Sequence, residues 1–315
     1  PDANVSLYYT NDGTIPTAGS TPVTGAIALN TNTVIRSISI SSDANIPSSF
    51  LETNTYFFNI SHTMRILSIC GDEIYDFITD VHPLAFDINF EGHIEMFSSA
   101  GVLIDEGAGN CNKHGNDSWY YDQRGIDFIM KDQYGYNYAL KDQIFKGKSR
   151  GEYKKLMIKA AANDNVSFEP GGAYIRDAFV HSLSQVGDLK MDERSYEPAI
   201  LYVNGEYWGL YELREWVADD GFTDYYYDQD EQFVESDSSI QFLRTWGNTW
   251  AHYGNNPALA DWNTFVTFVT SNDMSIQANF DYVDSVFNWK SMVDYFCVNS
   301  YTVCADWLNW NTSWW

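Results

Sequence analysis

The sequence is poor in basic residues, with 18 Lys and Arg against 43 Asp and Glu and a formal net charge of −25. Nucleic-acid binding requires clustered Lys and Arg that neutralise phosphates, and an anionic membrane surface attracts the same residues. The composition therefore argues against both partners. It is typical of a protein that stays soluble outside the cell, and it leaves a basic substrate or a divalent cation as charge-complementary ligands.

Long apolar runs are also missing. No stretch approaches the roughly 18 apolar residues that a membrane-spanning helix needs, so we expect no membrane span. No secretory leader precedes the first strand-like segment. Residue 1 is a proline inside that segment and residue 315 is a tryptophan inside another pattern, so we expect the sequence to be a fragment of a longer protein.

Short motifs that mark common sites are absent. There is no C-x-x-C pair, which argues against a zinc ribbon, and no H-x-H or H-E-x-x-H, which argues against a histidine-based metal site. The sequence has neither a G-x-x-x-x-G-K-[ST] phosphate loop nor a G-x-S-x-G elbow, and neither H-R-D nor D-F-G of ordinary protein kinases. Evidence of function must come from longer segments and their order.

Four cysteines are present. Cys297 and Cys304 lie seven residues apart in a helical pattern, about 10.5 Å along the axis. A disulfide requires Cα atoms within about 7 Å, so we expect these two to be separate, buried thiols. A bridge between Cys70 and Cys111 stays open at this stage.

The first 60 residues are typical of an all-β module. Val5–Thr10 alternates polar and apolar residues and ends at Asn11-Asp12-Gly13, a tight-turn signal. Short strands at regular spacing favour a sandwich. The expected strands are Val5–Thr10, Ala26–Leu29, Thr33–Ile40 and Thr55–Ile60.

The remainder of the chain mixes strand and helix patterns, which predicts an α+β fold. Asn204-Gly205 predicts the turn of a β-hairpin, and from residue 240 onward the pattern is helical, with an apolar stripe over residues 289–308 that we expect to be core. Strands are expected at Arg65–Ile69, Ala85–Phe90, Tyr153–Lys159, Ala199–Val203 and Glu206–Leu213, a loop at Gly107–Asp117 and a helix at Gly172–Leu183.

One segment of the N-terminal module carries a family resemblance. Tyr8-Tyr-Thr-Asn-Asp-Gly-Thr-Ile-Pro-Thr17 resembles the YYTxDGSxPT signature of chitobiase/β-hexosaminidase C-terminal-like modules, and the spacing to Val34-Ile-Arg36 and Tyr56-Phe57 is similar. The resemblance implies an accessory β-sandwich of an extracellular protein. We expect it to be a spacer without a site.

Four later segments resemble the CotH (spore-coat protein H) family, in the same order and at similar spacing. The most specific is Leu201–Glu215, which resembles the family block xYxNGxYxGxYxLxE. The other three are Arg124-Gly125, Lys159–Asn165 followed by Tyr174–Asp177, and Ala305–Asn311. We therefore expect an Ig-like sandwich module at 1–62 and an atypical protein-kinase-like domain, truncated at its C-terminus, at 63–315.

The CotH resemblance implies binding of ATP and of Mg²⁺ or Mn²⁺. Phosphoryl transfer needs an anchored triphosphate, a bridging metal and a carboxylate that orients the acceptor hydroxyl. The resemblance makes Asp306 the candidate for that carboxylate, and Asn309 and Asn311 the candidates for metal ligands. The alternative is that Asp306 and Asn309 merely cap the preceding helix.

Basic residues must hold the phosphates. Arg124, Lys131 and Lys159 are the candidates near the family segments, and for the two lysines the alternative is a solvated surface residue. Arg176 projects from a helix and could pair with an acid, for which Glu215 is one possibility. Such an ion pair could equally have a structural role or a catalytic role.

Two departures from the family pattern bear on activity. The family's lysine-rich stretch after RG is altered here to Ile126–Tyr136. The metal-binding WDxD segment that the family places after the Asp306 region does not occur within these 315 residues, so we expect them alone to be inactive or nearly so.

The leading hypothesis is an extracellular or cell-surface kinase that transfers phosphate from ATP to Ser or Thr of another surface protein. The second is a surface scaffold or adhesion protein that kept the fold and lost the nucleotide site. The third is a glycan-associated role, because aromatic residues make up 17% of the sequence and exposed rings can stack on sugars. The aromatic candidates are Tyr225–Tyr227, Trp310, Trp314 and Trp315.

Overall fold

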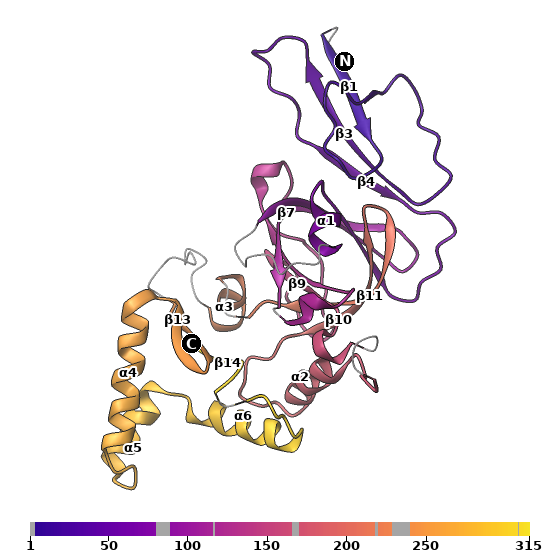
Figure 1. The fold of residues 1–315 in the computed structure, drawn as a ribbon. Helices are drawn as coiled ribbons and strands as arrows, with labels where there is room; N and C mark the ends of the chain where they lie inside the picture. Colours follow the sequence, from indigo (N-terminus) through magenta and orange to yellow (C-terminus); the bar gives the residue numbers. More distant parts are fainter. Residues whose placement is uncertain are drawn as a thin grey trace. The chain divides into compact units, whose positions relative to one another are not determined.

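The computed structural model describes residues 4–79, 89–115, 117–165, 170–217, 220–228, 240–307 and 309–315. Contacts divide the chain into two compact units, each described separately below (Figure 1). The first comprises Pro1–Arg176 and Tyr196–Glu215, and the second comprises Asp177–Ser195 and Trp216–Trp315. The fold mixes α and β structure with a β-rich N-terminal region, as predicted. The boundary expected at 62/63 stays a prediction.

The N-terminal module of the first unit is a four-stranded antiparallel sheet in the order β2-β1-β3-β4. Its strands are β1 (Val5–Thr10), β2 (Thr21–Pro22), β3 (Thr33–Ser41) and β4 (Glu52–Tyr56). The strand predicted at Ala26–Leu29 is wrong, since those residues have no regular structure. The described strands form this one sheet, and the second layer of a sandwich stays a prediction.

Seven further strands close into a barrel in the order β10-β11-β9-β8-β7-β6-β5. Only the closing pair, β5 with β10, is parallel, and the other neighbours are antiparallel. The strands are β5 (Arg65–Cys70), β6 (Phe90–Phe97), β7 (Leu103–His114), β8 (Gly125–Met130), β9 (Lys155–Lys159), β10 (Tyr196–Val203) and β11 (Glu206–Glu215). The short α1 (Ile74–Thr79) and the 3-10 helices η1 (Asp117–Tyr120), η2 (Asp132–Tyr134) and η3 (Ala162–Asp164) lie between them.

Side-chain alternation fills the barrel with apolar residues. Ile126 and Phe128 on β8, Leu156 and Ile158 on β9, and Leu213 on β11 belong to one fully buried cluster. Burial of one such side chain contributes about 1.5–3 kcal/mol. The strands predicted near Arg65, Tyr153, Ala199 and Glu206 are confirmed, while most of the strand predicted at Ala85–Phe90 lies outside the described residues.

The hairpin predicted at Asn204-Gly205 is confirmed. β10 and β11 pair across this turn, and both turn residues have positive φ, 48° for Asn204 and 84° for Gly205. That backbone matches the right-handed twist of the flanking strands, which is why Asn-Gly is favoured there.

The loop predicted at Gly107–Asp117 is wrong, because β7 runs to His114. A Cβ on Gly109 would overlap the backbone carbonyl of Ile129 on β8, and one on Gly107 would lie 2.8 Å from Met130 Sδ. These glycines allow the backbone of β7 to lie close to the neighbouring strand β8. The stretch is rich in glycine because its backbone is crowded by a neighbouring strand, whereas a loop is rich in glycine because its backbone must turn.

The described residues of the second unit form four helices and a three-stranded sheet in the order β13-β12-β14, together with most of α2 (Arg176–Val186). The helices are α3 (Asp220–Tyr227), α4 (Asn255–Ser271), α5 (Gln277–Val286) and α6 (Trp289–Tyr301). The strands are β12 (Phe242–Trp246), β13 (Asn248–Tyr253) and β14 (Thr312–Trp314). The helical prediction from residue 240 missed these strands, which turn at Gly247 with φ 74°.

The apolar stripe predicted as core over residues 289–308 is wrong in part. On α6, Val293 and Phe296 are exposed, and Val298 is the buried residue. Cys297 is exposed and Cys304 is half-buried, whereas Cys70 and Cys111 are buried, and all four are free thiols. No helix among the described residues is long and apolar enough to cross a membrane.

Candidate functional site

The outer face of three barrel strands carries a concentration of charged side chains. Strand alternation points Asp127 on β8, Lys155 and Lys159 on β9, and Glu212 and Arg214 on β11 away from the apolar interior. We call these five residues the charged face. Four of them are buried, with Glu212 and Arg214 only 2% and 1% exposed.

Register brings the side chains of the charged face together. Glu212 lies opposite Lys159 across the β9–β11 pair, and Arg214 Nη1 lies 3.6 Å from Glu212 Oε2. At its β8 edge, His114 Nδ1 lies 2.9 Å from Asp127 Oδ1. Charges removed from water are stable only when paired. Buried cations that alternate with carboxylates can hold an anionic ligand through charge-assisted hydrogen bonds.

Glu215 belongs to a second cluster on the interior side of β11. Its carboxylate is fully buried and accepts from Arg150 Nη1 at 2.9 Å and from Lys148 Nζ at 3.2 Å. The guanidinium of Arg150 also stacks over the ring of Tyr153 at 4.6 Å. Glu215 is therefore neutralised by two cations that the sequence did not single out.

The predicted pairing of Arg176 with Glu215 is wrong. Arg176, at the start of α2, lies 3.1 Å from Asp164 and also donates its backbone N–H to that carboxylate at 2.9 Å. Ala173 N donates to Asp164 as well, at 2.8 Å. The Asp164 carboxylate thus binds backbone N–H groups at the start of α2, where a negative charge is favourable. Arg176 pairs with this carboxylate and is part of the same local structure.

The other two predicted phosphate ligands differ in environment. The guanidinium of Arg124, just before β8, is buried over the ring of Trp119 at 5.2 Å. It also donates to the carbonyls of Tyr121 and Phe77, both at 3.4 Å. Lys131, at the start of η2, is exposed. Of the predicted basic residues, only Lys159 lies on the charged face.

The segment Ala305–Asn311 lies in the second unit, after α6. Asp306 is exposed and accepts from Asn311 Nδ2 at 2.6 Å, while Asn311 has φ 54°. The carbonyl of Asn309 accepts from Gly247 N at 2.6 Å and fastens the segment to the β12–β13 turn. The alternative that Asp306 and Asn309 cap α6 is wrong, because the helix ends at Tyr301.

The charged face has the chemistry to bind an anionic ligand such as a phosphate. Lys155, Lys159 and Arg214 offer three cations on adjacent strands, and guanidinium and ammonium groups are the usual phosphate partners. Within the described ranges, no group of three or more His, Cys, Asp and Glu is arranged to hold a metal ion. Asp306 and Asn311 lie together, but they bond to each other.

Sequence reasoning found Lys159 and Glu215 and missed Lys148, Arg150, Lys155 and Arg214. One signal was available for part of this set. Two charged residues flank an apolar one in Glu212-Leu213-Arg214, within a strand that continues a strongly apolar hairpin. A strand with charges on its second face is either solvated or part of a site, and only burial distinguishes the two.

Comparison with known proteins identifies the family. Residues 114–315 match the model of the CotH kinase protein family, and residues 1–50 match the chitobiase/beta-hexosaminidase C-terminal domain. The chain therefore belongs to the CotH kinase protein family and begins with a chitobiase-type module, as the motifs predicted. No curated protein is significantly similar to it.

Proposed function

We propose that the protein is a CotH-type kinase that uses ATP to phosphorylate Ser or Thr of a protein at the cell surface. The observation that carries the proposal is the charged face, which lies entirely within the residues that match the CotH kinase family. Arg214 lies 3.6 Å from Glu212, and Lys159 lies opposite the same residue across the β9–β11 pair, so these two cations stand beside one carboxylate before a nucleotide arrives. Preorganised cations of this kind stabilise the charge of a phosphoryl group during transfer.

The individual residues have separate roles in this proposal. Lys159 and Arg214 bind the phosphates, and Glu212 orients both cations through its ion pair with Arg214 and its position opposite Lys159. From the family resemblance alone, we assign Asp306 of the second unit as the carboxylate that orients an acceptor hydroxyl and takes its proton. ATP supplies the phosphoryl group, and the family suggests Mg²⁺ or Mn²⁺ as its counterion.

Calorimetric titration with ATP, with and without Mg²⁺ or Mn²⁺, tests the proposal. We expect Lys159→Met to weaken ATP binding by about tenfold or more, which corresponds to about 1.4 kcal/mol. The matched control is Lys146→Met, because Lys146 is exposed and pairs with Glu197 away from the charged face. Equal affinities of the two variants, or no binding at millimolar ATP, would contradict the assignment.

A scaffold without catalytic activity is the second candidate. Two observations favour it: the Asp306 carboxylate is already bonded by Asn311, and Arg124 is committed to Trp119. An extracellular or cell-surface location is part of both candidates and is inferred from the acidic composition and the module. Immunolabelling of intact cells, compared with permeabilised cells, tests that location.

A glycan partner has less support. Trp314 packs against Trp262 at 5.2 Å between ring centroids, and Trp315 donates its indole N–H to Asp192 at 2.7 Å. Trp310 packs edge-on against Trp246 at 4.9 Å. Three of the predicted sugar-stacking rings thus already have protein partners. Slower migration of the protein in native gels that contain soluble polysaccharide would support glycan binding.

A further inference from the structure

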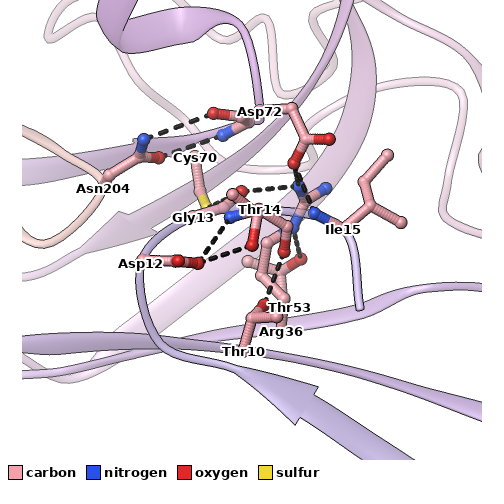
Figure 2. A network of polar contacts seen from close by, with 11 residues as sticks. Thr10, Asp12, Gly13, Thr14, Ile15, Arg36, Thr53, Cys70, Asp72 and Asn204 are labelled. Atoms are coloured by element: carbon pink, nitrogen blue, oxygen red, sulfur yellow. Dashed lines mark hydrogen bonds and ion pairs between the residues drawn. The ribbon is translucent and has the colours of Figure 1, made fainter. Parts of the chain in front are cut away.

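The signature segment of the N-terminal module contacts the barrel (Figure 2). Gly13 follows β1 with φ +89°, and a Cβ there would overlap the side-chain amide of Asn204. Asn204 is the first residue of the β10–β11 turn. Glycine is therefore required at position 13 for two reasons. Its backbone is left-handed, and there is no room for a side chain beside Asn204.

Three hydrogen bonds to neighbouring barrel residues fix the position of Asn204 beside this turn. Its side chain accepts from Gly71 N at 3.1 Å and donates to Gly71 O at 3.3 Å, and its backbone N–H donates to Ile69 O at 2.9 Å. On the opposite side of the turn, a Cβ on Gly205 would lie 3.2 Å from Val34 N in the module. The barrel residues that meet or support the turn are Gly71, Asp72, Asn204 and Gly205, and we call these four residues the notch.

A buried arginine joins the two sides. Arg36 on β3 is 1% exposed and donates to Gly13 O at 2.8 Å and to Thr53 Oγ1 at 3.4 Å. The same guanidinium lies 3.5 Å from Asp72 of the barrel, and Asp72 in turn accepts from the backbone N–H of Ile15. A buried guanidinium without these acceptors would be strongly unfavourable.

A second anchor lies on β4. Thr55 donates its backbone N–H to Glu95 of β6 at 3.0 Å, and its hydroxyl bonds to the same carboxylate. The hydroxyls of Thr55 and Ser68 on β5 lie 2.6 Å apart. The module is therefore attached at two separate places, and both use barrel carboxylates as acceptors for module backbone N–H groups.

We propose that the Asp12–Ile15 turn is a docking element whose partner is the Gly71–Asp72–Asn204–Gly205 notch, so that module and barrel form one rigid body. This replaces the expectation that the module is a spacer without a site. It also gives the Tyr8–Thr17 signature a role in this chain, since its Asp-Gly turn is the part that enters the notch. The proposal is independent of the kinase assignment, because neither the notch nor the turn includes a residue of the charged face.

Hydrogen exchange on the whole chain tests the docking directly. Ile15 and Thr55 donate backbone N–H groups to barrel side chains, whereas Thr14 donates to Asp12 within the module at 3.1 Å. In the unaltered protein we expect protection of all three amides. Asp72→Asn should raise exchange of Ile15 by about tenfold or more while Thr14 stays protected, because a weaker acceptor affects only the interface.

Gly13→Ala provides a second test with two matched controls. Gly171→Ala introduces a similar left-handed strain, at φ +90°, with nothing within 4 Å, and Gly25→Ala introduces a methyl group into open space. Docking predicts that Gly13→Ala, unlike either control, exposes Ile15 and Thr55 to exchange together. Free exchange of Ile15 and Thr55 in the unaltered protein, or equal effects of Gly13→Ala and Gly171→Ala on them, would overturn the proposal.

Discussion

At the residue scale, the barrel depends on charges that are buried with their partners. Glu215 is fully buried between Arg150 and Lys148. Glu215→Gln would leave two cations facing a neutral amide, and we expect it to lower the free energy of unfolding by about 3 kcal/mol. Urea denaturation measures this loss.

The control for Glu215→Gln is Lys146→Met at the exposed Lys146–Glu197 pair, whose side-chain nitrogen and oxygen lie 3.6 Å apart. Exposed pairs contribute less than about 1 kcal/mol. A small effect of Glu215→Gln, similar to that of the control, would show that the cluster is open to water in solution.

The environment of Glu95 makes the free energy of unfolding depend on pH. The pKa of Glu95 is raised from 4.5 to about 7, chiefly because burial disfavours the charged carboxylate. The neighbouring Glu106 and Glu52 carboxylates also raise this pKa, while the hydrogen bonds from Thr55 lower it. The folded state therefore binds a proton more tightly than the unfolded state. The resulting stabilisation is complete below about pH 4.5 and is lost as pH rises through about 7, by about 3 kcal/mol in total.

Urea unfolding of the unaltered chain and of Glu95→Gln, at about pH 5 and about pH 8, measures this effect. The unaltered chain should lose more stability than the variant on going to the higher pH. Burial lowers the pKa of the nearby His93 to about 3, so its ring stays neutral throughout this range. Parallel pH profiles of the two proteins would rule out Glu95 as the titrating group.

At the element scale, glycine has two different roles that composition does not separate. Gly205 and Gly13 occupy left-handed turns, whereas Gly109 lies inside β7 beside the Ile129 carbonyl. We expect Gly109→Ala to destabilise the barrel by several kcal/mol, because backbone atoms cannot move aside as a flexible side chain does. Thermal unfolding of Gly109→Ala beside Gly151→Ala, where nothing lies within 4 Å of the added Cβ, measures the difference. A melting temperature equal to that of the control would mean that β7 ends before Gly109.

Strand alternation also acts at this scale. Because β11 places Leu213 in the apolar interior and Glu212 and Arg214 on the opposite face, one strand contributes to the core and to the charged face together. A register shift of one residue would exchange the two sets. The Asn204-Gly205 turn and the irregularity in the β10–β11 pairing between Leu201 and Tyr202 together set that register, and thereby the placement of the candidate site.

At the scale of the whole molecule, the net charge of −25 opposes compactness. Self-repulsion among like charges falls as the Debye length shrinks from about 30 Å at about 0.01 M salt to about 8 Å at about 0.15 M. We therefore expect the melting temperature to rise with NaCl over this range, measured by calorimetry. An equivalent concentration of sucrose, which does not screen charge, separates screening from solvent exclusion. A melting temperature that falls with salt would mean that attractive surface ion pairs such as Lys146–Glu197 outweigh the repulsion.

The sequence by itself determined the features that depend on short stretches of chain. The family followed from Leu201–Glu215, the hairpin followed from Asn204-Gly205, and the apolar strands followed from their period of two. Turn chemistry and alternation act between neighbours a few residues apart, so they can be recognised before any tertiary contact is known.

Only the tertiary structure decided which charges meet. Arg150 and Glu215 are 65 residues apart in the chain, and β5 pairs with β10 across most of the barrel sequence. The predictions for Arg176 and for the Gly107–Asp117 loop were wrong because partner choice and strand register depend on closure of the barrel. No local pattern contains that information, since an ion pair is chosen by distance in space and by shared burial.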